Sequence, residues 1–277
     1  MPELPEVETV RRSLAELILG RTIAAIQPRE FPGVMGDDDI DAVAARVVGR
    51  RITAARRRAK YLFLDLDDGT SLMVHLRMTG HLVVRDRAAP PLRFEHLAIE
   101  LDDGRDLRFA DQRKFGRVLH LPPDAARILH ARMGPEPLAP SFTADLLGIR
   151  LARRPGKLKS VLLDQGLVAG LGNIYVDEAL FRARLHPERA ANSLTVYEVR
   201  RLHRAIRAVL REALDNRGTT FSSFQNAYGE SGGNQRNLRV YGRKPDEPCD
   251  RCGGPLTRIV VGGRGTHLCA RCQPLAT

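Results

Sequence analysis

The first twenty positions repeat apolar residues at the spacing of an amphipathic helix. One face of that helix would carry Val7, Val10, Leu14, Leu17 and Ile18. A stripe of this kind normally packs on a core. Pro5 suits the first turn, Glu6 and Glu8 suit the positive end of the helix dipole, and Gly20 suits the stop. The pattern therefore predicts a helix that begins near Pro5 and ends before Gly20.

Residues 21 to 121 follow a different pattern, in which short apolar runs often alternate with polar positions. Such runs predict β-strands, and they occupy Thr22–Ile26, Lys60–Leu66, Ser71–Arg77, Glu95–Leu101, Asp106–Ala110 and Val118–Leu121. Two Asp-Asp-Gly tripeptides, at 67–69 and 102–104, predict hairpin turns between strands. One helix interrupts them, with apolar residues from Ile40 to Val47 and a stop at Gly49. We expect a β-sandwich with a helix at its start.

The proline-rich segment Gly134–Pro140 predicts a linker, because beyond it the apolar period becomes helical. Helices are predicted at Asp145–Arg153, Lys159–Gln165 and Asn173–Arg184. A longer helix follows the capping box Thr195–Glu198 and ends before Gly218. Its polar face carries Arg200, Arg201, Arg204, Arg207 and Arg211.

Residues 219 to 237 show no apolar period and are rich in Gly, Ser, Asn and Gln. A stretch of this kind is typical of a mobile loop, often a lid in an enzyme. Plain disorder is the competing interpretation.

The four cysteines form two close pairs near the C-terminus, Cys249–Cys252 and Cys269–Cys272. Two CxxC knuckles at this spacing predict one tetrahedral zinc site of four thiolates; two disulfides are the alternative. Four protein ligands leave no open position for a catalytic water, so we expect a structural zinc. The residues between the knuckles predict a hairpin that presents Arg264 as a phosphate contact, although an incidental surface arginine would look the same.

Charge narrows the class of partner. The chain of 277 residues has 44 Lys and Arg against 33 Asp and Glu, a formal net charge of +11. Such an excess points to a polyanion, nucleic acid first, although a generally basic protein would share it. No apolar run reaches the ~20 residues needed to cross a bilayer. The acidic start is unlike a signal peptide, and the clustered cysteines suggest a reducing, intracellular compartment.

Three stretches are candidates for contacts with DNA. One is a dense basic run, which a charged strand edge would also explain: Arg50, Arg51, Arg56, Arg57, Arg58 and Lys60. The segment Asp111–Gly116 sets Phe115 among cations, which suits insertion into a base stack; a core phenylalanine is the simpler alternative. The glycine-rich turn at 166–172 opens a helix at Asn173, which could cap that helix or contact a phosphate.

The first residues carry candidate chemistry. If Met1 is removed, Pro2 has a free secondary amine, and an α-amino group titrates at about 7.7–8.0. Such an amine can attack a sugar aldehyde carbon and form an iminium. Glu3 stands beside it as a possible proton donor or acceptor. An ordinary helix start is the alternative, but it does not account for Pro2 and Glu3, which precede the helix.

Taken together, four stretches resemble bacterial formamidopyrimidine-DNA glycosylases. They are Pro2–Glu8, Asp111–Gly116, Gln165–Tyr175 and the cysteine hairpin, in the family's order along the whole chain. The resemblance implies an α+β multidomain fold: an N-terminal β-sandwich with an N-terminal helix, then a helical helix–two-turn–helix domain with a C-terminal zinc-ribbon hairpin. The domains would be a catalytic sandwich (1–133), a linker (134–140), the helix–two-turn–helix domain (141–218), a mobile lesion-recognition loop (219–240) and the zinc finger (241–277).

The resemblance also implies a bifunctional DNA glycosylase and AP lyase of base excision repair. It would act as a monomer in the bacterial cytoplasm on double-stranded DNA, removing 8-oxoguanine and formamidopyrimidine. The implied catalytic residues are the nucleophile Pro2, the general acid/base Glu3, and Glu6, Lys60 and Arg264. The implied DNA contacts are the phosphate ligands His75 and Asn173, the intercalating trio Met78, Arg113 and Phe115, and Lys159 and Tyr241. The implied zinc ligands are Cys249, Cys252, Cys269 and Cys272.

The chain departs from the family's usual pattern at a few positions. Ala59 stands where a glycine is common, and Phe221–Phe224 and Gly233-Asn234 are unusual in the 219–237 loop, so exact lesion preference stays open. Two other functions also stay open. One is an endonuclease VIII-type enzyme for oxidised pyrimidines, against which Leu4 and the 113–115 loop argue. The other is a zinc-dependent DNA-binding protein without catalytic activity.

Overall fold

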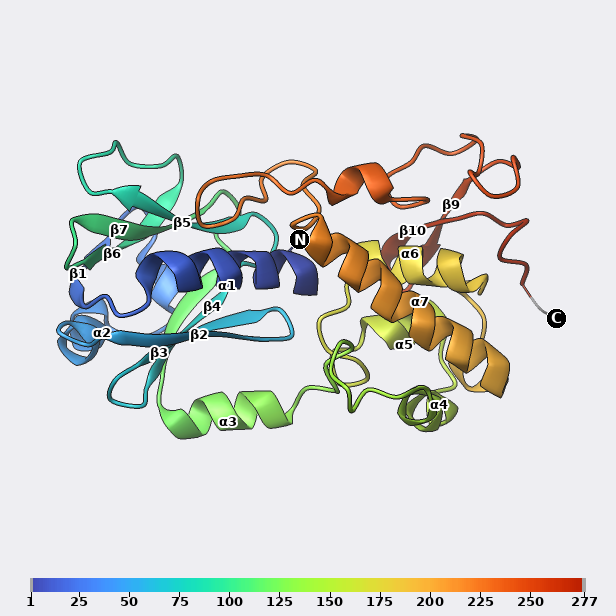
Figure 1. Cartoon of the computed structure of the whole chain (residues 1–277), viewed down its shortest axis with the longest axis horizontal. Coiled ribbons are helices and arrows are strands. Elements are labelled where there is room, and N and C mark those ends of the chain that lie inside the picture. The colour runs from blue at the N-terminus through green and yellow to red at the C-terminus, as the bar shows by residue number, and fades with distance from the viewer. Residues whose placement is uncertain (1, 276–277) are drawn as a thin grey trace. The chain divides into compact units, whose positions relative to one another are not determined.

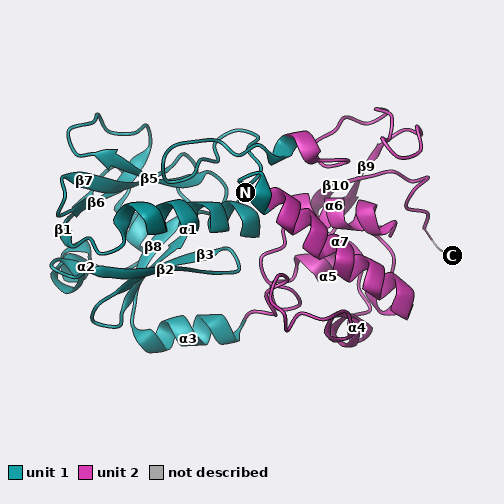
Figure 2. Ribbon diagram, in the orientation of Figure 1, with its two compact units in different colours: residues 1–132, 214–235 teal, residues 133–213, 236–277 magenta. Residues whose placement is uncertain are grey.

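The computed structural model describes residues 2–275 and divides into two compact units (Figures 1 and 2). Unit 1 comprises the residues up to 132 together with 214–235, and unit 2 comprises 133–213 together with the residues from 236 onward. No helix in the described part of the chain is both long and apolar enough to cross a membrane.

Unit 1 is a sandwich of two four-stranded antiparallel sheets. One sheet has the order β1-β6-β7-β5, from β1 (Ile23–Pro28), β6 (Glu95–Leu101), β7 (Arg105–Asp111) and β5 (Gly80–Asp86). The other has the order β2-β3-β4-β8, from β2 (Ile52–Arg58), β3 (Tyr61–Leu66), β4 (Ser71–His75) and β8 (Arg117–Leu121). The helices are α1 (Leu4–Ile18), α2 (Ile40–Val47), α3 (Pro123–Ala131) and the 3-10 turn η1 (Pro32–Met35). The predicted sandwich with an N-terminal helix is confirmed.

Helix α1 forms because its apolar stripe has a core to cover. Val7, Val10 and Leu14 are each at most 1% exposed and pack with residues of both sheets. Fully burying a leucine stabilises a fold by roughly 1.5–3 kcal/mol, so this stripe holds α1 against the sandwich. The residues just before α1 are thereby fixed as well.

Besides the short turn η1, two strands and one helix of unit 1 were not predicted from the sequence. Strand β2 ends in three arginines, Arg56–Arg58, so its sequence does not show the alternation of apolar and polar residues that predicts a strand. Nevertheless the Arg57 side chain is only 12% exposed. Long arginine stems are buried in this way along apolar surfaces. Strand β5 starts at Gly80, where an added Cβ would lie 2.5 Å from the Leu76 carbonyl oxygen. The approach lies across the turn from Leu76 to Gly80, whose main-chain N–H donates to the Leu76 carbonyl at 3.0 Å, so this glycine marks a tight entry into a strand. The helix is α3.

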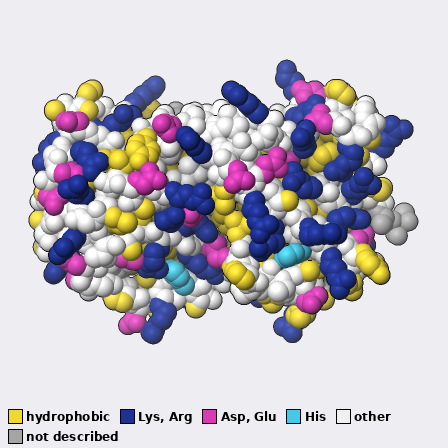
Figure 3. Space-filling model, in the orientation of Figure 1, with side chains coloured by type: hydrophobic (Ala, Val, Ile, Leu, Met, Phe, Trp, Pro, Cys, Tyr) yellow, Lys and Arg dark blue, Asp and Glu magenta, His cyan; other side chains and the backbone are white. Residues whose placement is uncertain are grey.

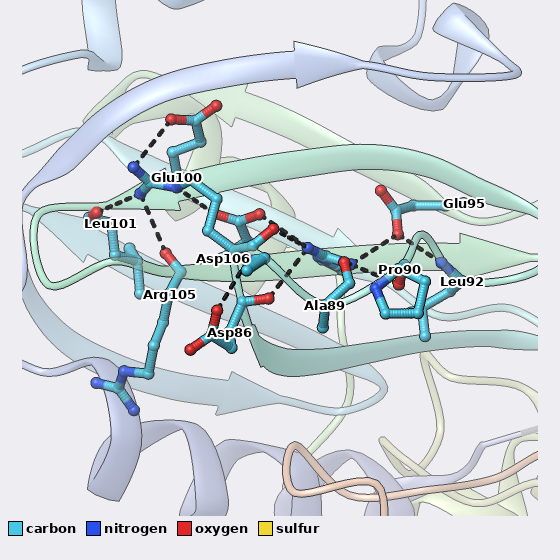
Figure 4. A network of polar contacts seen from close by, with 12 residues as sticks. Asp86, Ala89, Pro90, Leu92, Glu95, Glu100, Leu101, Arg105 and Asp106 are labelled. Atoms are coloured by element: carbon cyan, nitrogen blue, oxygen red, sulfur yellow. Dashed lines mark hydrogen bonds and ion pairs between the residues drawn. The ribbon is translucent and has the colours of Figure 1, made fainter.

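A network of ion pairs and hydrogen bonds around the buried side chains of Arg108 and Asp106 joins β6 and β7 (Figure 4). Arg108, 3% exposed, donates to Asp106 and to the carbonyls of Ala89 and Pro90. Arg87 donates to the other Asp106 oxygen at 2.9 Å. Since the cations are paired with carboxylates and carbonyls, their desolvation is offset, and the loop between β5 and β6 is held in place.

The segment 219–235 belongs to unit 1 and is anchored to α1. Thr219 N–H donates to Glu6 at 2.7 Å and Ala227 N–H donates to Ser13 Oγ at 3.0 Å. Phe224 lies in the apolar core of the unit. The segment lacks a regular helix or strand before η3 (Asn234–Asn237), as the sequence indicated. A lid motion would have to release these anchors.

Unit 2 is helical and ends in a two-stranded hairpin. Its elements are α4 (Ala144–Ala152), α5 (Leu158–Leu163), α6 (Asn173–Ala183), the 3-10 turn η2 (Ala191–Ser193), most of α7 (Val196–Asp215), β9 (Thr257–Val261) and β10 (Arg264–Leu268). Figure 3 shows Lys and Arg side chains gathered over α7. Two of its arginines are structural: Arg201 donates to the Ala183 carbonyl and Arg207 to those of Pro137 and Ala139.

Candidate functional site

Pro2 and Glu3 stand immediately before α1, and both are buried. Glu3 is the N-cap residue, and its main-chain N–H donates to Glu6 Oε2 at 2.9 Å. Helix α1 itself starts at Leu4. The predicted helix is therefore confirmed, and the two candidate catalytic residues lie outside it. Met1, on whose removal the chemistry of Pro2 depends, lies outside the described residues.

Glu6 is 1% exposed and accepts two main-chain hydrogen bonds, from Glu3 and from Thr219. Each carboxylate oxygen therefore has a hydrogen-bond donor, as a buried polar group requires. The second catalytic carboxylate predicted from sequence is thus built into the fold at the start of α1.

Lys60 lies in the two-residue turn between β2 and β3, where Arg58 pairs with Tyr61. It is 7% exposed. The preceding Ala59 has a φ of +53°, a left-handed conformation that glycine adopts without strain. A glycine here, which the resemblance led us to expect, would avoid this strain, whereas this chain accepts it beside Lys60.

Three arginines of the basic run are neutralised within unit 1. Arg56 pairs with Asp65, Arg57 with Glu8 and Arg50 with Asp68. For these residues the charged strand-edge interpretation is the better one. Burial acts to raise the pKa of Glu8, but hydrogen bonds and charges of Arg11, Arg57 and Arg12 outweigh it and hold that pKa below its ordinary value.

His75 ends strand β4 and is held as a neutral imidazole. Its Nδ1 accepts the Arg77 main-chain N–H at 3.0 Å, and its ring makes an edge contact with Tyr61. Burial, then the charges of Arg77 and Lys60, lower its pKa to about 3. Because Nδ1 is an acceptor, the neutral ring carries its proton on Nε2, where it can donate to a phosphate oxygen.

The structure brings Met78, Arg113 and Phe115 together on the surface of unit 1. Arg113 Nη1 lies 3.0 Å from the Met78 sulfur, and its guanidinium lies 4.9 Å from the Phe115 ring centroid. Met78 is 40% and Phe115 50% exposed, so Phe115 is not a core residue and that alternative is wrong. Three adjoining groups, two apolar and one cationic, form a compact wedge of the kind that enters a base stack.

The predicted contact Lys159 is fully buried in unit 2. Its ammonium lies 2.7 Å from Asp177 Oδ1 and donates to the Gly265 carbonyl at 3.0 Å. Asp177 Oδ2 accepts the His267 main-chain N–H at 2.9 Å. This ion pair fixes β10 against α5 and α6, which favours a positioning task for Lys159. A direct contact with DNA stays a prediction.

Asn173 is the first residue of α6, and Gly172 is the N-cap. The Asn173 amide donates to the Gly265 carbonyl at 3.0 Å, so it does not cap its helix. Its buried Oδ1 has no hydrogen-bond partner among the described residues. Arg264 begins β10 after the turn Gly262-Gly263, whose φ values are +56° and +72°. The exposed Arg264 side chain is thus presented next to the carbonyl that Lys159 and Asn173 hold.

Tyr241 is half-buried and fixed through its main chain. Glu178, buried in α6, accepts the main-chain N–H groups of Arg239, Val240 and Tyr241 at 2.8–3.0 Å. Burial raises the Glu178 pKa, although the three N–H donors oppose it. The Tyr241 ring packs edge-on against His267 at 5.0 Å.

Four cysteine sulfurs in unit 2 gather at one point. The Sγ atoms of Cys249, Cys252, Cys269 and Cys272 all lie within 4.8 Å of one another and form no disulfide. A tetrahedron with zinc–sulfur bonds of about 2.3 Å needs sulfurs roughly 3.8 Å apart, and two of the pairs lie at 3.5 and 3.9 Å. Donor type and spacing both fit one structural zinc, and the disulfide alternative is wrong.

The sequence analysis missed the carboxylates that hold these groups in place. Asp177 and Glu178 brace the hairpin and the Tyr241 segment, and buried Asp111 holds the loop of Arg113 and Phe115. For Asp177 and Glu178 the available signal was two adjacent acids in a largely apolar helix, since acids in such a setting need buried partners. Unit 1 therefore holds Pro2, Glu3, Glu6, Lys60, His75 and the wedge, and unit 2 holds Lys159, Asn173, Tyr241, Arg264 and the cysteines.

Three family models match the chain. They are the formamidopyrimidine-DNA glycosylase N-terminal domain over residues 1–118, the formamidopyrimidine-DNA glycosylase H2TH domain over 133–225, and the zinc finger found in FPG and IleRS over 246–275.

Individual proteins match along the full length. The formamidopyrimidine-DNA glycosylase of Herpetosiphon aurantiacus is 48% identical, with 99% of this chain and 100% of the relative covered. The crystal structure of MutM (FPG) from Thermus thermophilus has a TM-score of 0.88 at 44% identity, with 100% of both chains covered. A Lactococcus lactis FPG mutant in complex with Fapy-dG-containing DNA has a TM-score of 0.92 at 38% identity, covering 99% of this chain and 100% of the other.

Proposed function

This chain belongs to the formamidopyrimidine-DNA glycosylase family, and we propose that the unblocked Pro2 amine is its nucleophile. The enzyme is a DNA glycosylase with AP lyase activity. Lactococcus lactis relatives were crystallised with Fapy-dG DNA and with abasic-site DNA. We assign both substrate classes, oxidised purine and abasic site in duplex DNA, to this chain.

Base removal begins at Pro2. The amine nitrogen forms a bond to the anomeric carbon of the flipped nucleotide while the bond from that carbon to the base breaks. The sugar ring opens and a cationic iminium remains on Pro2. Glu3 is the nearest carboxyl in the sequence and moves the protons that these steps require. What carries this assignment is that Pro2 and Glu3 stand outside α1, with the Glu3 main chain tied to buried Glu6.

Strand cleavage follows from the same iminium. Its positive charge acidifies the neighbouring sugar carbon, so a base can remove a proton there and expel the 3′ phosphate, and a second elimination expels the 5′ phosphate. These β- and δ-eliminations also explain activity on sites that have already lost their base. Lys60, the neutral His75, Asn173 and Arg264 are assigned to the phosphates around the flipped nucleotide.

The wedge of Met78, Arg113 and Phe115 is assigned to the hole that the extruded nucleotide leaves. Unstacking costs a few kcal/mol, and an apolar plug offsets part of that cost. The arginine can face the orphaned cytosine and donate to its acceptors. One structural zinc holds the hairpin of Arg264.

Endonuclease VIII-type specificity is not favoured, because relatives 47–48% identical over 99% of this chain bear the name formamidopyrimidine-DNA glycosylase. The DNA-binding protein without catalytic activity is likewise not favoured, since Pro2 and Glu3 keep the family's positions. We assign the protein to the bacterial cytoplasm, because four thiolates in one metal cluster suit a reducing compartment.

Borohydride trapping tests this function. The wild-type protein, with Met1 shown by mass spectrometry to be absent, should form a covalent adduct with duplex DNA that contains 8-oxoguanine. Pro2→Gly should reduce trapping at least about a hundredfold. Arg264→Ala should slow base removal and still bind zinc. A wild-type protein that binds lesion DNA without being trapped would contradict the assignment and favour the binding-protein alternative.

A further inference from the structure

Asp111 is fully buried and accepts hydrogen bonds from three residues of the β7–β8 loop, which carries Arg113 and Phe115 of the wedge. Its Oδ2 accepts the Gly116 main-chain N–H at 2.7 Å, and its Oδ1 accepts that of Arg113 at 3.2 Å. Its main-chain oxygen accepts the Lys114 N–H at 3.2 Å. One residue thus closes the turn that carries Arg113 and Phe115.

The same carboxylate reaches the second half of the wedge. Asp111 Oδ1 also accepts the hydroxyl of Thr79, the residue next to Met78. Thr79 Oγ1 in turn accepts the Arg113 main-chain N–H at 3.2 Å. Asp111 therefore links the β4–β5 loop, with Met78, to the β7–β8 loop, with Arg113 and Phe115.

Both loops need such restraint, because each contains a strained residue. Arg77, beside Met78, and Lys114, between Arg113 and Phe115, have φ values of +53° and +59°. Non-glycine residues hold this conformation only where their surroundings enforce it. Gly116 closes the turn tightly, since an added Cβ would lie 2.4 Å from Phe109 Cζ.

Asp111 is itself held from behind. Its main-chain oxygen also accepts His96 Nε2 at 2.7 Å, and its main-chain N–H donates to the Phe94 carbonyl at 3.0 Å. His96 is fully buried. The carboxylate is thus anchored in the sheet on one side and bonded to the wedge loops on the other, so the wedge geometry is set before DNA binds.

We propose that Asp111 is a positioning residue that preorganises Met78, Arg113 and Phe115, and through Arg113 sets the preference for the base opposite the lesion. This inference rests on the function proposed above. A wedge already in place adds no ordering cost when the base is flipped. Without Asp111 the loops would have to order during the flip, and excision would slow.

The test compares Asp111→Asn with Asp106→Asn. The side chain of an asparagine at 111 has one acceptor oxygen. The main-chain N–H of either Gly116 or Arg113 would therefore face the NH₂ group instead of an oxygen. Asp106 lies on the same strand, is 2% exposed and serves the Arg87 and Arg108 network away from the wedge. It controls for the loss of a buried carboxylate as such. Thr79→Val, a milder change, tests the same link if Asp111→Asn folds poorly.

Single-turnover excision of 8-oxoguanine opposite cytosine should slow about tenfold in Asp111→Asn, and about threefold in Thr79→Val. The ratio of excision opposite cytosine to that opposite adenine should fall in both, and 2-aminopurine placed opposite the lesion should report weaker wedge insertion. Asp106→Asn should lower thermal stability and leave the cytosine-to-adenine ratio at the wild-type value.

A double-mutant cycle with Arg113→Ala identifies the route of the effect. If Asp111 acts through Arg113, Asp111→Asn costs much less in the Arg113→Ala background. The positioning role is overturned if the losses in excision rate from Asp111→Asn and Arg113→Ala are additive. It is also overturned if Asp111→Asn and Thr79→Val both fold and keep the wild-type cytosine-to-adenine ratio. In either case trapping of the wild type on lesion DNA would still support the proposed function. Failure of the wild type to be trapped on lesion DNA would instead remove the proposed function on which this role rests.

Discussion

Glu6 accepts a 2.7 Å hydrogen bond from the main-chain N–H of Thr219, a residue 213 positions further along the chain. The other Glu6 oxygen accepts the Glu3 N–H at 2.9 Å. Gly218 passes so close that an added Cβ would lie 3.1 Å from Glu6 Oε1, and its φ is +83°. One buried carboxylate thus ties the reactive N-terminus to the start of the 219–235 segment.

Glu6→Gln should impair both base removal and folding. Glutamine has one acceptor oxygen, and its NH₂ group would face the main-chain N–H of either Glu3 or Thr219. One of the two buried hydrogen bonds would then be replaced by two donors facing each other. We expect excision to fall about 10- to 100-fold and the free energy of unfolding to fall by about 1–3 kcal/mol. Single-turnover kinetics and urea denaturation measure the two effects.

The matched control for that variant is Glu16→Gln. Glu16 lies on the same helix, and among the described residues its side chain accepts a hydrogen bond from the exposed Tyr228 hydroxyl of the same segment. Excision at the wild-type rate is expected there. An equal loss in both variants would mean that anchoring the segment in general, and not the Glu6 carboxylate, supports catalysis.

His75 should make the fold less stable in acid. Its pKa of about 3 in the folded protein lies below the unfolded value of about 6.5. Between these two pKa values His75 is protonated in the unfolded chain and neutral in the folded protein. The free energy of unfolding is therefore not reduced by His75 above pH 6.5 and falls progressively as the pH drops from 6.5 towards 3. The titration of His75 changes the free energy of unfolding by at most about 1.4 kcal/mol per pH unit.

Melting curves of wild type and His75→Gln between pH 5 and 8 test this. Glutamine does not titrate, so the variant should lose less stability than the wild type between pH 7 and 5. Above pH 7 the two pH dependences should be parallel. Parallel curves over the whole range would contradict a neutral, buried His75.

Zinc removal should loosen the β9–β10 hairpin, which then keeps its contacts with Lys159, Asn173 and Asp177 along β10. The four cysteines form no disulfide, so zinc alone would link them covalently. In small zinc-binding peptides, metal binding stabilises the fold by about 10–16 kcal/mol. Mass spectrometry should find one zinc per chain, and Cys272→Ser or a strong chelator should lower it together with affinity for lesion DNA. Arg264→Ala is the control that keeps the metal. Full DNA affinity without zinc would contradict a structural role.

Breaking the Lys159–Asp177 pair should destabilise unit 2. Lys159→Met leaves the fully buried Asp177 carboxylate without its cation, which typically costs about 3–5 kcal/mol. Adding Asp177→Leu removes the stranded charge and should recover much of the loss. Urea denaturation of the two single variants and the double variant checks this; strict additivity would show that the pair does not act as a unit.

Ala59→Gly should relieve strain. The φ of +53° at Ala59 costs an alanine about 1 kcal/mol relative to glycine, less the entropy that glycine loses on folding. Stabilisation of up to about 1 kcal/mol is expected, whereas Ala55→Gly, within strand β2, should destabilise. Thermal melts of both variants decide the sign.

Much of this protein follows from short-range sequence signals. The stripe from Val7 to Ile18 specifies α1, because one helical face must meet a core. The four cysteines specify the metal site, because ligand type and spacing suffice. Pro2 and Glu3 draw their chemistry from their own functional groups and their place at the chain start. Each of these signals lies within one stretch of the chain, the longest being the 24 residues from Cys249 to Cys272.

Only the tertiary structure decided how those groups are held. Thr219 meets Glu6, Lys159 meets Asp177, and Asp111 joins Thr79 to Arg113, and no local pattern encodes which distant residue supplies a partner. A buried carboxylate must find donors, but the folded backbone determines which donors are near. Sequence therefore named the reactive groups and the metal ligands, and packing selected the buried acids that fix their positions.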